Sequence, residues 1–285
     1  MSDIWENGPS EANEEHLEEM MRTTKAPKLP ETAYERQEMG DALCNQGRVR
    51  EAIVHYRKAV ELEMGNPNYH TRLGDAYAYS DESIKAVAQY RKALKISPRR
   101  AEPHYSLAEI YRRYGKWTAA VAEYRQATQF NAMNPFYRYK LGDALWHVGL
   151  YSEAIIQLEM AVQIADCDGF YHFWLADMYS QYARMDDAIV EMQQATMFSP
   201  YDAYYSFRLG LLYIEAGYPE DAVAALKRAI KLNPDDLTYH AMLAEAYDMC
   251  GNVEKAQRHF QYADKMDYYE SANLAAIRRK TEGRV

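Results

Sequence analysis

The sequence predicts an all-α solenoid, because one pattern of small and large residues recurs seven times at a constant spacing of 34 residues. Three columns of the pattern are small, and a fourth is large and mostly aromatic. The first small column consists of Gly40, Gly74, Ala108, Gly142, Ala176, Gly210 and Ala244. The second consists of Ala52, Ala86, Ala120, Ala154, Ala188, Ala222 and Ala256, and the third of Ala59, Ala93, Ala127, Ala161, Ala195, Ala229 and Ala263. The large column consists of Tyr56, Tyr90, Tyr124, Leu158, Met192, Leu226 and Phe260.

Each unit is expected to be a pair of helices joined by a short turn, and residues 203–236 contain its parts most clearly. Gly217 ends the first helix, because glycine adopts the left-handed conformation at a helix end without strain. Pro219 stands at the start of the second helix, where its missing N–H leaves no helical hydrogen bond unmade. The small column of the first helix then faces the two alanine columns of the second, so the two backbones approach closely.

The columns resemble those of the tetratricopeptide repeat family, whose 34-residue motif runs W-x2-L-G-x2-Y…A-x3-F…A…P. Repeat two carries the matching residues His70, Leu73, Gly74, Tyr77, Ala86, Tyr90, Ala93 and Pro98. The resemblance covers residues 33–270 as repeats 33–66, 67–100, 101–134, 135–168, 169–202, 203–236 and 237–270. The family's tryptophan is replaced by His70, His104, His172, His240, Arg36, Arg138 and Ser206. The resemblance implies a right-handed superhelix of seven helix-turn-helix repeats.

Two segments flank the predicted repeats. Residues 1–32 form an acidic tail and linker, in which a disordered tail and a docking segment that folds on a partner are both open. The anchors of such a segment would be Ile4, Trp5, Leu17, Met20 and Met21. Residues 271–281 are expected to form a capping helix, with Leu274 and Ile277 covering the last repeat, before a basic tail that ends at residue 285.

Charge and composition narrow the function. The net charge is −9, but residues 1–21 hold seven acids and no Lys or Arg, which leaves 33 bases against 35 acids in the rest. A nearly neutral body argues against nucleic acid as a ligand. We expect no membrane insertion, because no apolar run reaches 18 residues. Three scattered cysteines do not suggest a disulfide framework, so a reducing cytoplasm is expected.

No motif indicates an enzyme, a cofactor or a metal site. The sequence lacks a phosphate-binding glycine loop, a G-x-S-x-G elbow and an H-E-x-x-H pair. The recurring histidines are expected to be packing residues at repeat junctions, because equivalent sites in successive repeats lie too far apart for one ion. Asp166-Cys167-Asp168-Gly169 lacks the later ligands of a calcium loop and is interpreted as a turn.

The first helix of each repeat would, by the resemblance, line a groove through its second, fifth, ninth, twelfth and thirteenth positions. The ninth positions are mostly acidic, and pairing with Arg72 or Lys140 three residues earlier is the alternative to ligand binding. Repeats four to six place aromatic pairs at the second and fifth positions, either open to a partner or packed between neighbouring first helices. The candidate partner-binding residues are Tyr105, Phe136, Tyr139, Asp143, Trp146, Phe170, Phe173, Asp177, Tyr204 and Phe207.

These residues predict a non-enzymatic scaffold that binds a protein or peptide with apolar anchors and basic residues. The Lys and Asn with which some members of the family hold a C-terminal carboxylate are replaced by Gln37, Asp41, Thr71 and Asp75. The alternative is a self-assembling protein, an oligomer or filament. In that case the acidic start and the basic end, with Arg278, Arg279, Lys280 and Arg284, would join copies head to tail.

Overall fold

The computed structural model describes residues 32–264, and every regular element in that range is an α-helix. The all-α solenoid prediction is therefore confirmed for the part of the chain that is described. The helices of the first three repeats are α2 (Ala33–Asn45), α3 (Val49–Leu62), α4 (Pro67–Tyr79), α5 (Ser83–Ile96), α6 (Ala101–Arg113) and α7 (Trp117–Phe130). Those that follow are α8 (Pro135–His147), α9 (Tyr151–Ile164), α10 (Gly169–Gln181), α11 (Met185–Phe198), α12 (Ala203–Ala216), α13 (Pro219–Leu232) and α14 (Leu237–Met249), with residues 253–264 also helical. The expected docking segment and the expected capping helix lie outside the described residues.

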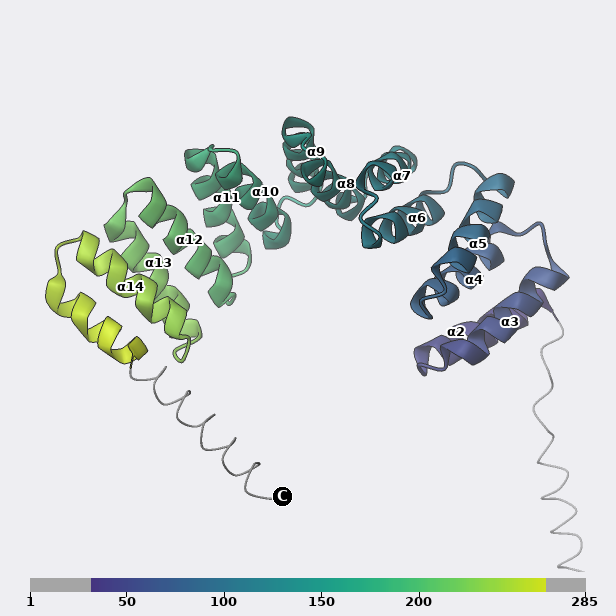
Figure 1. The fold of residues 1–285 in the computed structure, drawn as a ribbon, viewed down its shortest axis with the longest axis horizontal. Coiled ribbons are helices and arrows are strands. Elements are labelled where there is room, and N and C mark those ends of the chain that lie inside the picture. Colours follow the sequence, from purple (N-terminus) through teal and green to yellow (C-terminus); the bar gives the residue numbers. More distant parts are fainter. Residues whose placement is uncertain (1–31, 265–285) are drawn as a thin grey trace, which may run out of the picture. The chain divides into compact units, whose positions relative to one another are not determined.

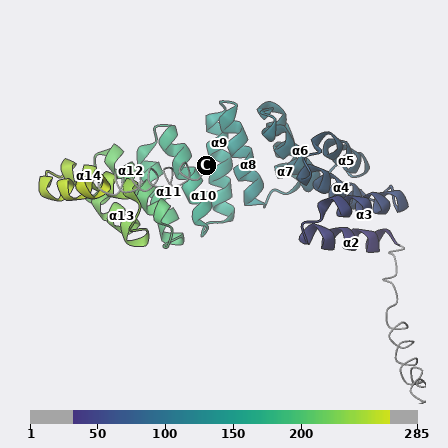
Figure 2. The same cartoon turned by 60° about the horizontal axis from the view of Figure 1, so that its bottom comes forward.

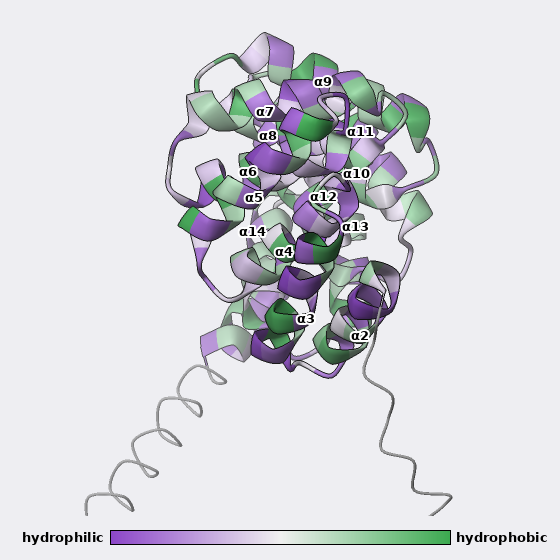
Figure 3. Cartoon of the chain, turned by 90° about the vertical axis from the view of Figure 1, so that its right-hand side faces the viewer, coloured by the Kyte–Doolittle hydropathy of each residue, from purple (hydrophilic) through white to green (hydrophobic). Residues whose placement is uncertain are grey.

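The chain divides into two compact units between Pro98 and Arg99. In the first unit α2 packs on α3, α4 packs on α5, and α3 contacts α4. The second unit repeats this arrangement from α6 to α14: α6, α8, α10 and α12 each pack on the next helix, and α8, α10, α12 and α14 each contact the helix before (Figures 1 and 2). Figure 3 shows hydrophobic and hydrophilic stretches alternating along the same helices, as expected when each helix has one buried side.

The interface inside each helix pair depends on the small columns. A Cβ atom added to Gly210 would lie 2.6 Å from Cγ of Leu226, and one added to Gly142 would lie 2.5 Å from Cδ1 of Leu158. The alanines of the second column are fully or almost fully buried. The close approach that offsets the poor helix propensity of glycine is therefore present, as the columns predict.

Turns and caps fix where the helices begin and end. Gly217 has φ +78°, as expected for the end of α12, and Pro219 is the first residue of α13. The equivalent turn positions in repeats two and five are Asp81 and Ala183, which adopt the same left-handed conformation at φ +61° and +59°. Several first helices begin at a side-chain cap, where an oxygen accepts hydrogen bonds from backbone N–H groups of the first turn. These caps are Thr32, Asn66, Asn134, Asp168, Asp202 and Asp236.

The recurring histidines join a first helix to its own second helix and to the loop before it. Nδ1 of His172 lies 2.6 Å from Oε2 of Glu191, and Nε2 lies 2.9 Å from the carbonyl oxygen of Asp166. His70 makes the equivalent contacts with Gln89 and the carbonyl of Met64. These contacts confirm the packing interpretation, and Asp166 and Asp168 belong to an inter-repeat turn. None of the helices described for residues 32–264 is long and apolar enough to cross a membrane.

Candidate functional site

Most of the aromatic residues predicted to bind a partner form one chain of ring contacts across α6, α8, α10 and α12. We call this set the aromatic row, and its members are Tyr105, Phe136, Tyr139, Phe170, Phe173, Tyr204 and Phe207. The ring centroids of Tyr105 and Phe136 are 5.9 Å apart, and those of Tyr139 and Phe170 are 5.0 Å apart. Phe173 and Tyr204 continue the chain at 5.7 Å. The row thus runs through four repeats of the second unit on their first helices.

The members of the row differ in exposure, so both arrangements considered from the sequence occur: some rings are open, and others pack between neighbouring first helices. Phe173 and Phe207 are buried, at 7% and 9% exposure, because each stacks on a tyrosine of the next repeat. Phe173 stacks on Tyr205 at 4.8 Å, and Phe207 stacks on Tyr239 at 4.6 Å. Phe136 and Tyr204 remain exposed, at 38% and 46%. Tyr105, Tyr139 and Phe170 are partly buried. The accessible surface of the row is therefore provided mainly by the rings of Phe136 and Tyr204.

Trp146 stands apart from the row, although the sequence analysis grouped it with these rings. Its indole contacts Tyr151 at the start of α9, with ring centroids 4.7 Å apart. Tyr151 in turn approaches Tyr182 at 6.2 Å. Trp146 therefore belongs to an aromatic cluster at the turn end of the helix pairs.

Three of the acidic ninth positions pair with bases of the following repeat, whereas the alternative considered from the sequence was pairing with a base three residues earlier. Nε of Arg72 lies 3.9 Å from Asp41, Nζ of Lys140 lies 3.4 Å from Glu109, and Arg208 donates to Asp177 at 2.6 Å. Each base stands at the sixth position of its repeat, next to the fifth-position residue of the groove. Three of the acids that would attract a basic ligand are thus neutralised by the chain itself.

Two of these bases also lie over rings of the aromatic row. Nζ of Lys140 is 5.3 Å from the ring centre of Phe136 and 5.8 Å from that of Tyr139. The Arg208 guanidinium is 5.6 Å from the ring centre of Phe173 and 5.8 Å from that of Tyr204, whose hydroxyl accepts a hydrogen bond from it at 3.1 Å. The chain's own cations therefore occupy cation–π positions that a basic ligand would otherwise take.

Asp143 and Glu109 are ninth-position acids with opposite electrostatics. Burial raises the pKa of Asp143, and the charges of His147, Lys140 and Arg112 offset this only in part. Glu109 shows the contrast. Burial also acts to raise its pKa, but hydrogen bonds from Tyr124 and Arg112, together with the charge of Lys140, bring the pKa below its usual value. The nearest cationic side chain to Asp143 is His147, with Nδ1 3.6 Å from Oδ1.

Trp174 of α10 is a residue of this surface that sequence reasoning missed. Its indole contacts Tyr139 at 5.4 Å and Phe173 at 5.4 Å, so it lies inside the aromatic row between repeats four and five. It occupies the sixth position, which holds Arg72, Lys140 and Arg208 in repeats two, four and six. Comparing that column across the repeats would have drawn attention to it, because Trp174 is its only aromatic residue.

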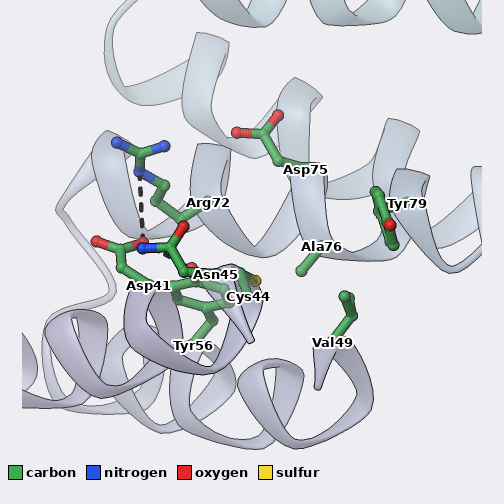
Figure 4. A pocket seen from close by; sticks show the side chains of 9 residues that line it. All are labelled: Asp41, Cys44, Asn45, Val49, Tyr56, Arg72, Asp75, Ala76 and Tyr79. Atoms are coloured by element: carbon green, nitrogen blue, oxygen red, sulfur yellow. Dashed lines mark hydrogen bonds and ion pairs between the residues drawn. The ribbon is translucent and has the colours of Figure 1, made fainter. Parts of the chain in front are cut away.

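A separate polar pocket of about 510 Å³ lies among α2, α3 and α4 in the first unit (Figure 4). Its lining residues are Asp41, Cys44, Asn45, Val49, Tyr56, Arg72, Asp75, Ala76 and Tyr79. Figure 4 shows the Arg72 guanidinium above the Asp41 carboxylate, which also accepts a hydrogen bond from the Tyr56 hydroxyl at 2.6 Å. The pocket is therefore closed on one side by an ion pair of the chain's own residues.

The surface is suited to non-covalent binding. Burial raises the pKa of Tyr139 to about 12, so its hydroxyl is protonated at neutral pH. Among residues 32–264, no cluster of three or more His, Cys, Asp or Glu side chains is arranged to hold a metal ion. The rings offer apolar contact area, and the carboxylate of Asp143 offers one acceptor group.

Comparisons with known proteins agree with this architecture. Family models described as TPR repeat and Tetratricopeptide repeat match residues 40–79, 67–100, 108–149 and 213–268, which together cover more than half of the chain. No curated protein sequence matches the chain closely enough to count as a relative.

Several solved structures share the fold. The crystal structure of MamA protein is 20% identical over 60% of this chain and 94% of its own, with a TM-score of 0.56. YrrB, described as a TPR protein with an unusual peptide-binding site, is 22% identical over 65% of this chain and 95% of its own, also with a TM-score of 0.56. A chain of the APC/C hetero-tetramer Cut9-Hcn1 is 17% identical over 83% of this chain and 46% of its own, again with a TM-score of 0.56.

Proposed function

Because this chain is a tetratricopeptide repeat protein, we propose that it is a non-enzymatic interaction scaffold that holds a segment of another polypeptide. The segment lies on the first helices of repeats three to six, along the aromatic row. The observation that carries this proposal is the chain of ring contacts from Tyr105 to Phe207, which Trp174 bridges between Phe170 and Phe173, with Phe136 and Tyr204 open to solvent. Exposed aromatic rings of this kind are frequent anchors of an interaction site.

The partner is expected to combine apolar anchors with a limited number of basic residues. Phe136 and Tyr204 provide the exposed ring area for apolar side chains. Glu109 and Asp177 are satisfied by Lys140 and Arg208, which lowers their attraction for further cations. The peptide-binding site in the description of YrrB adds a precedent for this use of the fold.

The proposal is tested by selecting peptides from a random display library on the immobilised full-length protein. The double variant Phe136→Ser plus Tyr204→Ser removes the two exposed rings and should weaken binding of the selected peptides roughly tenfold or more, as loss of aromatic anchors does at interfaces. Tyr201→Ser is the matched control, because Tyr201 is 88% exposed but stands in a loop outside the row. Equal binding by the double variant and the control would reject the aromatic row as the site.

A second candidate is self-assembly, which the opposite charges of residues 1–21 and 278–284 favour. Light scattering against protein and salt concentration separates the two candidates. Head-to-tail docking predicts a mass that rises with protein concentration and falls with salt. A constant monomer mass, with and without residues 1–32, would reject self-assembly and leave the scaffold proposal intact.

A further inference from the structure

Within each of the two units, the side chains at two positions meet where one repeat follows another along the first helices. The ninth position of one repeat faces the sixth position of the next, as Asp41–Arg72, Glu109–Lys140 and Asp177–Arg208 show. Leu211 and Met242 stand at the same two positions in repeats six and seven, and both pack against one hydrophobic cluster. Each of these four pairs is matched, either as an acid with a base or as two apolar side chains.

The pair between repeats four and five is the mismatch. Asp143 stands at the ninth position of repeat four, and the sixth position of repeat five holds Trp174 in place of a base. The indole of Trp174 lies 5.4 Å from the ring of Tyr139, which is one helical turn before Asp143 on α8. The carboxylate therefore stands among aromatic rings where its counterparts have a guanidinium or ammonium group.

The neighbouring bases of the second unit are already engaged elsewhere. Lys140 and Arg112 both contact Glu109, at 3.4 Å and 2.9 Å, and Arg208 is bonded to Asp177. Nδ1 of His147 lies 2.8 Å from the backbone carbonyl of Asp143, closer than its 3.6 Å to the carboxylate. The Asp143 side chain is 27% exposed, so an incoming group can reach it.

We infer that Asp143 and Trp174 form a slot for a single Lys or Arg side chain of the bound polypeptide. This inference rests on the proposed function and adds the identity and position of one ligand group. The cation takes the place that Arg208 holds beside Asp177, with the carboxylate on one side and the indole face on the other. A charge-assisted hydrogen bond and a cation–π contact then act on the same group.

The rise in the pKa of Asp143 agrees with this assignment, since burial destabilises its carboxylate and the charges of His147, Lys140 and Arg112 offset this only in part. A polypeptide suits the slot better than a free amine does. The rings of Phe136 and Phe170 flank it on α8 and α10, so residues beside the Lys or Arg find apolar contacts. The slot therefore fixes the register of the segment along the aromatic row.

The test compares display selections on the wild-type protein and on two variants. The wild type should select peptides with apolar anchors and a strongly enriched Lys or Arg at one position. Asp143→Asn keeps the size of the side chain and removes its charge, so apolar anchors should remain while the basic preference disappears. For a wild-type-selected peptide, affinity should fall roughly tenfold on this change, the order expected for a partly desolvated cation contact.

The second variant, Trp174→Arg, recreates the pairing that repeats five and six already have. The new guanidinium should occupy the slot, so this variant should also lose the basic preference while still binding through Phe136 and Tyr204. Retention of apolar enrichment by either variant shows that the variant is folded. Asp177→Asn is the matched control, because Asp177 is already paired with Arg208, and it should keep the basic preference at its wild-type position.

The outcomes separate the slot from the proposed function. Apolar enrichment without a basic position in the wild type, or a basic position that persists in Asp143→Asn, overturns the slot and leaves the scaffold proposal standing. If the wild-type protein enriches peptides no better than the Phe136→Ser plus Tyr204→Ser variant does, both the slot and the scaffold proposal are overturned.

Discussion

Ala183 connects α10 to α11 in the left-handed conformation, at φ +59°, where five other repeats have glycine. A Cβ atom clashes with the neighbouring carbonyl in this conformation, at a cost of roughly 1–2 kcal/mol. Ala183→Gly should therefore raise the urea midpoint of unfolding by the equivalent of about 1 kcal/mol. Asp81→Gly, at φ +61°, should gain less, because aspartate tolerates this conformation better than alanine does. A lower midpoint for Ala183→Gly would contradict the strain assignment.

At Gly142 the glycine is required by the lack of space for a side chain and not by the backbone conformation. An added Cβ would lie 2.5 Å from Cδ1 of Leu158 and 3.1 Å from the carbonyl oxygen of Ala154. Overpacking of this kind costs about 1–3 kcal/mol, which exceeds the gain of about 1 kcal/mol in helix propensity. Gly142→Ala should thus lower stability in a denaturation experiment.

A compensating variant checks the cause of that loss. Repeat five has Ala176 opposite Met192 at the same two positions, so Gly142→Ala plus Leu158→Met should recover most of the stability. Gly65→Ala serves as the control, because a Cβ there would meet no atom within 4 Å. Equal effects at Gly65 and Gly142 would exclude steric crowding as the reason for the small column.

At the scale of the helix pair, His172 joins α10, α11 and the preceding loop. Burial acts to lower its pKa, but contacts with Glu191 and with the carbonyl of Asp166 outweigh burial and raise the pKa overall. A raised folded-state pKa means that the protonated ring stabilises the fold. This contribution is complete below the unfolded pKa of about 6.5 and is lost as pH rises through the folded value.

His172→Gln should therefore destabilise the protein more at pH 6 than at pH 9, measured as the difference in urea midpoint from the wild type. His70→Gln is the matched control, because the equivalent partner is Gln89, which carries no charge. The pH dependence of its effect should be smaller. A destabilisation by His172→Gln that is the same at both pH values would show that the ring acts through packing alone.

The sequence predicts a structural feature well when the residues responsible for it recur in every repeat. The columns of small residues predicted the all-α fold and the helix-pair interface, because each pair solves the same packing problem. Sequence analysis left open which aromatic rings are packed, because the burial of Phe173 and Phe207 depends on a tyrosine at the third position of the next repeat. Tyr137, Tyr205 and Tyr239 share the third position, and each stacks on the fifth-position ring of the preceding repeat.

The acid–base pairs show the same limit. Sequence analysis considered pairing three residues along one helix as an alternative, but the side chains of adjacent first helices are also neighbours. There the base reaches the acid of the preceding repeat. A search for pairs separated by 31 residues would have identified Asp41–Arg72, Glu109–Lys140 and Asp177–Arg208. The same search pairs Asp75 with Ser106 and Asp143 with Trp174, and only the second of these two exceptions lies within one unit.

At the scale of the whole molecule, most of the net charge belongs to residues 1–21, which hold seven acids and no Lys or Arg. The rest of the chain is close to neutral, with 33 bases and 35 acids. An excess of negative charge raises the local concentration of basic ligands and accelerates their encounter at low ionic strength. We therefore predict that the acidic segment accelerates association of a basic peptide without contributing to the slot at Asp143.

Stopped-flow measurement of the association rate of a selected basic peptide tests whether the acidic segment accelerates binding in this way. Deletion of residues 2–21 should slow association several-fold at about 20 mM salt and leave it nearly unchanged at about 500 mM, where the Debye length is only a few ångströms. The dissociation rate should stay the same, because steering acts before contact. Faster association after the deletion would mean that the segment competes for the groove instead. An unchanged salt dependence would place the electrostatic attraction on the repeats themselves, with Asp143 as its main source.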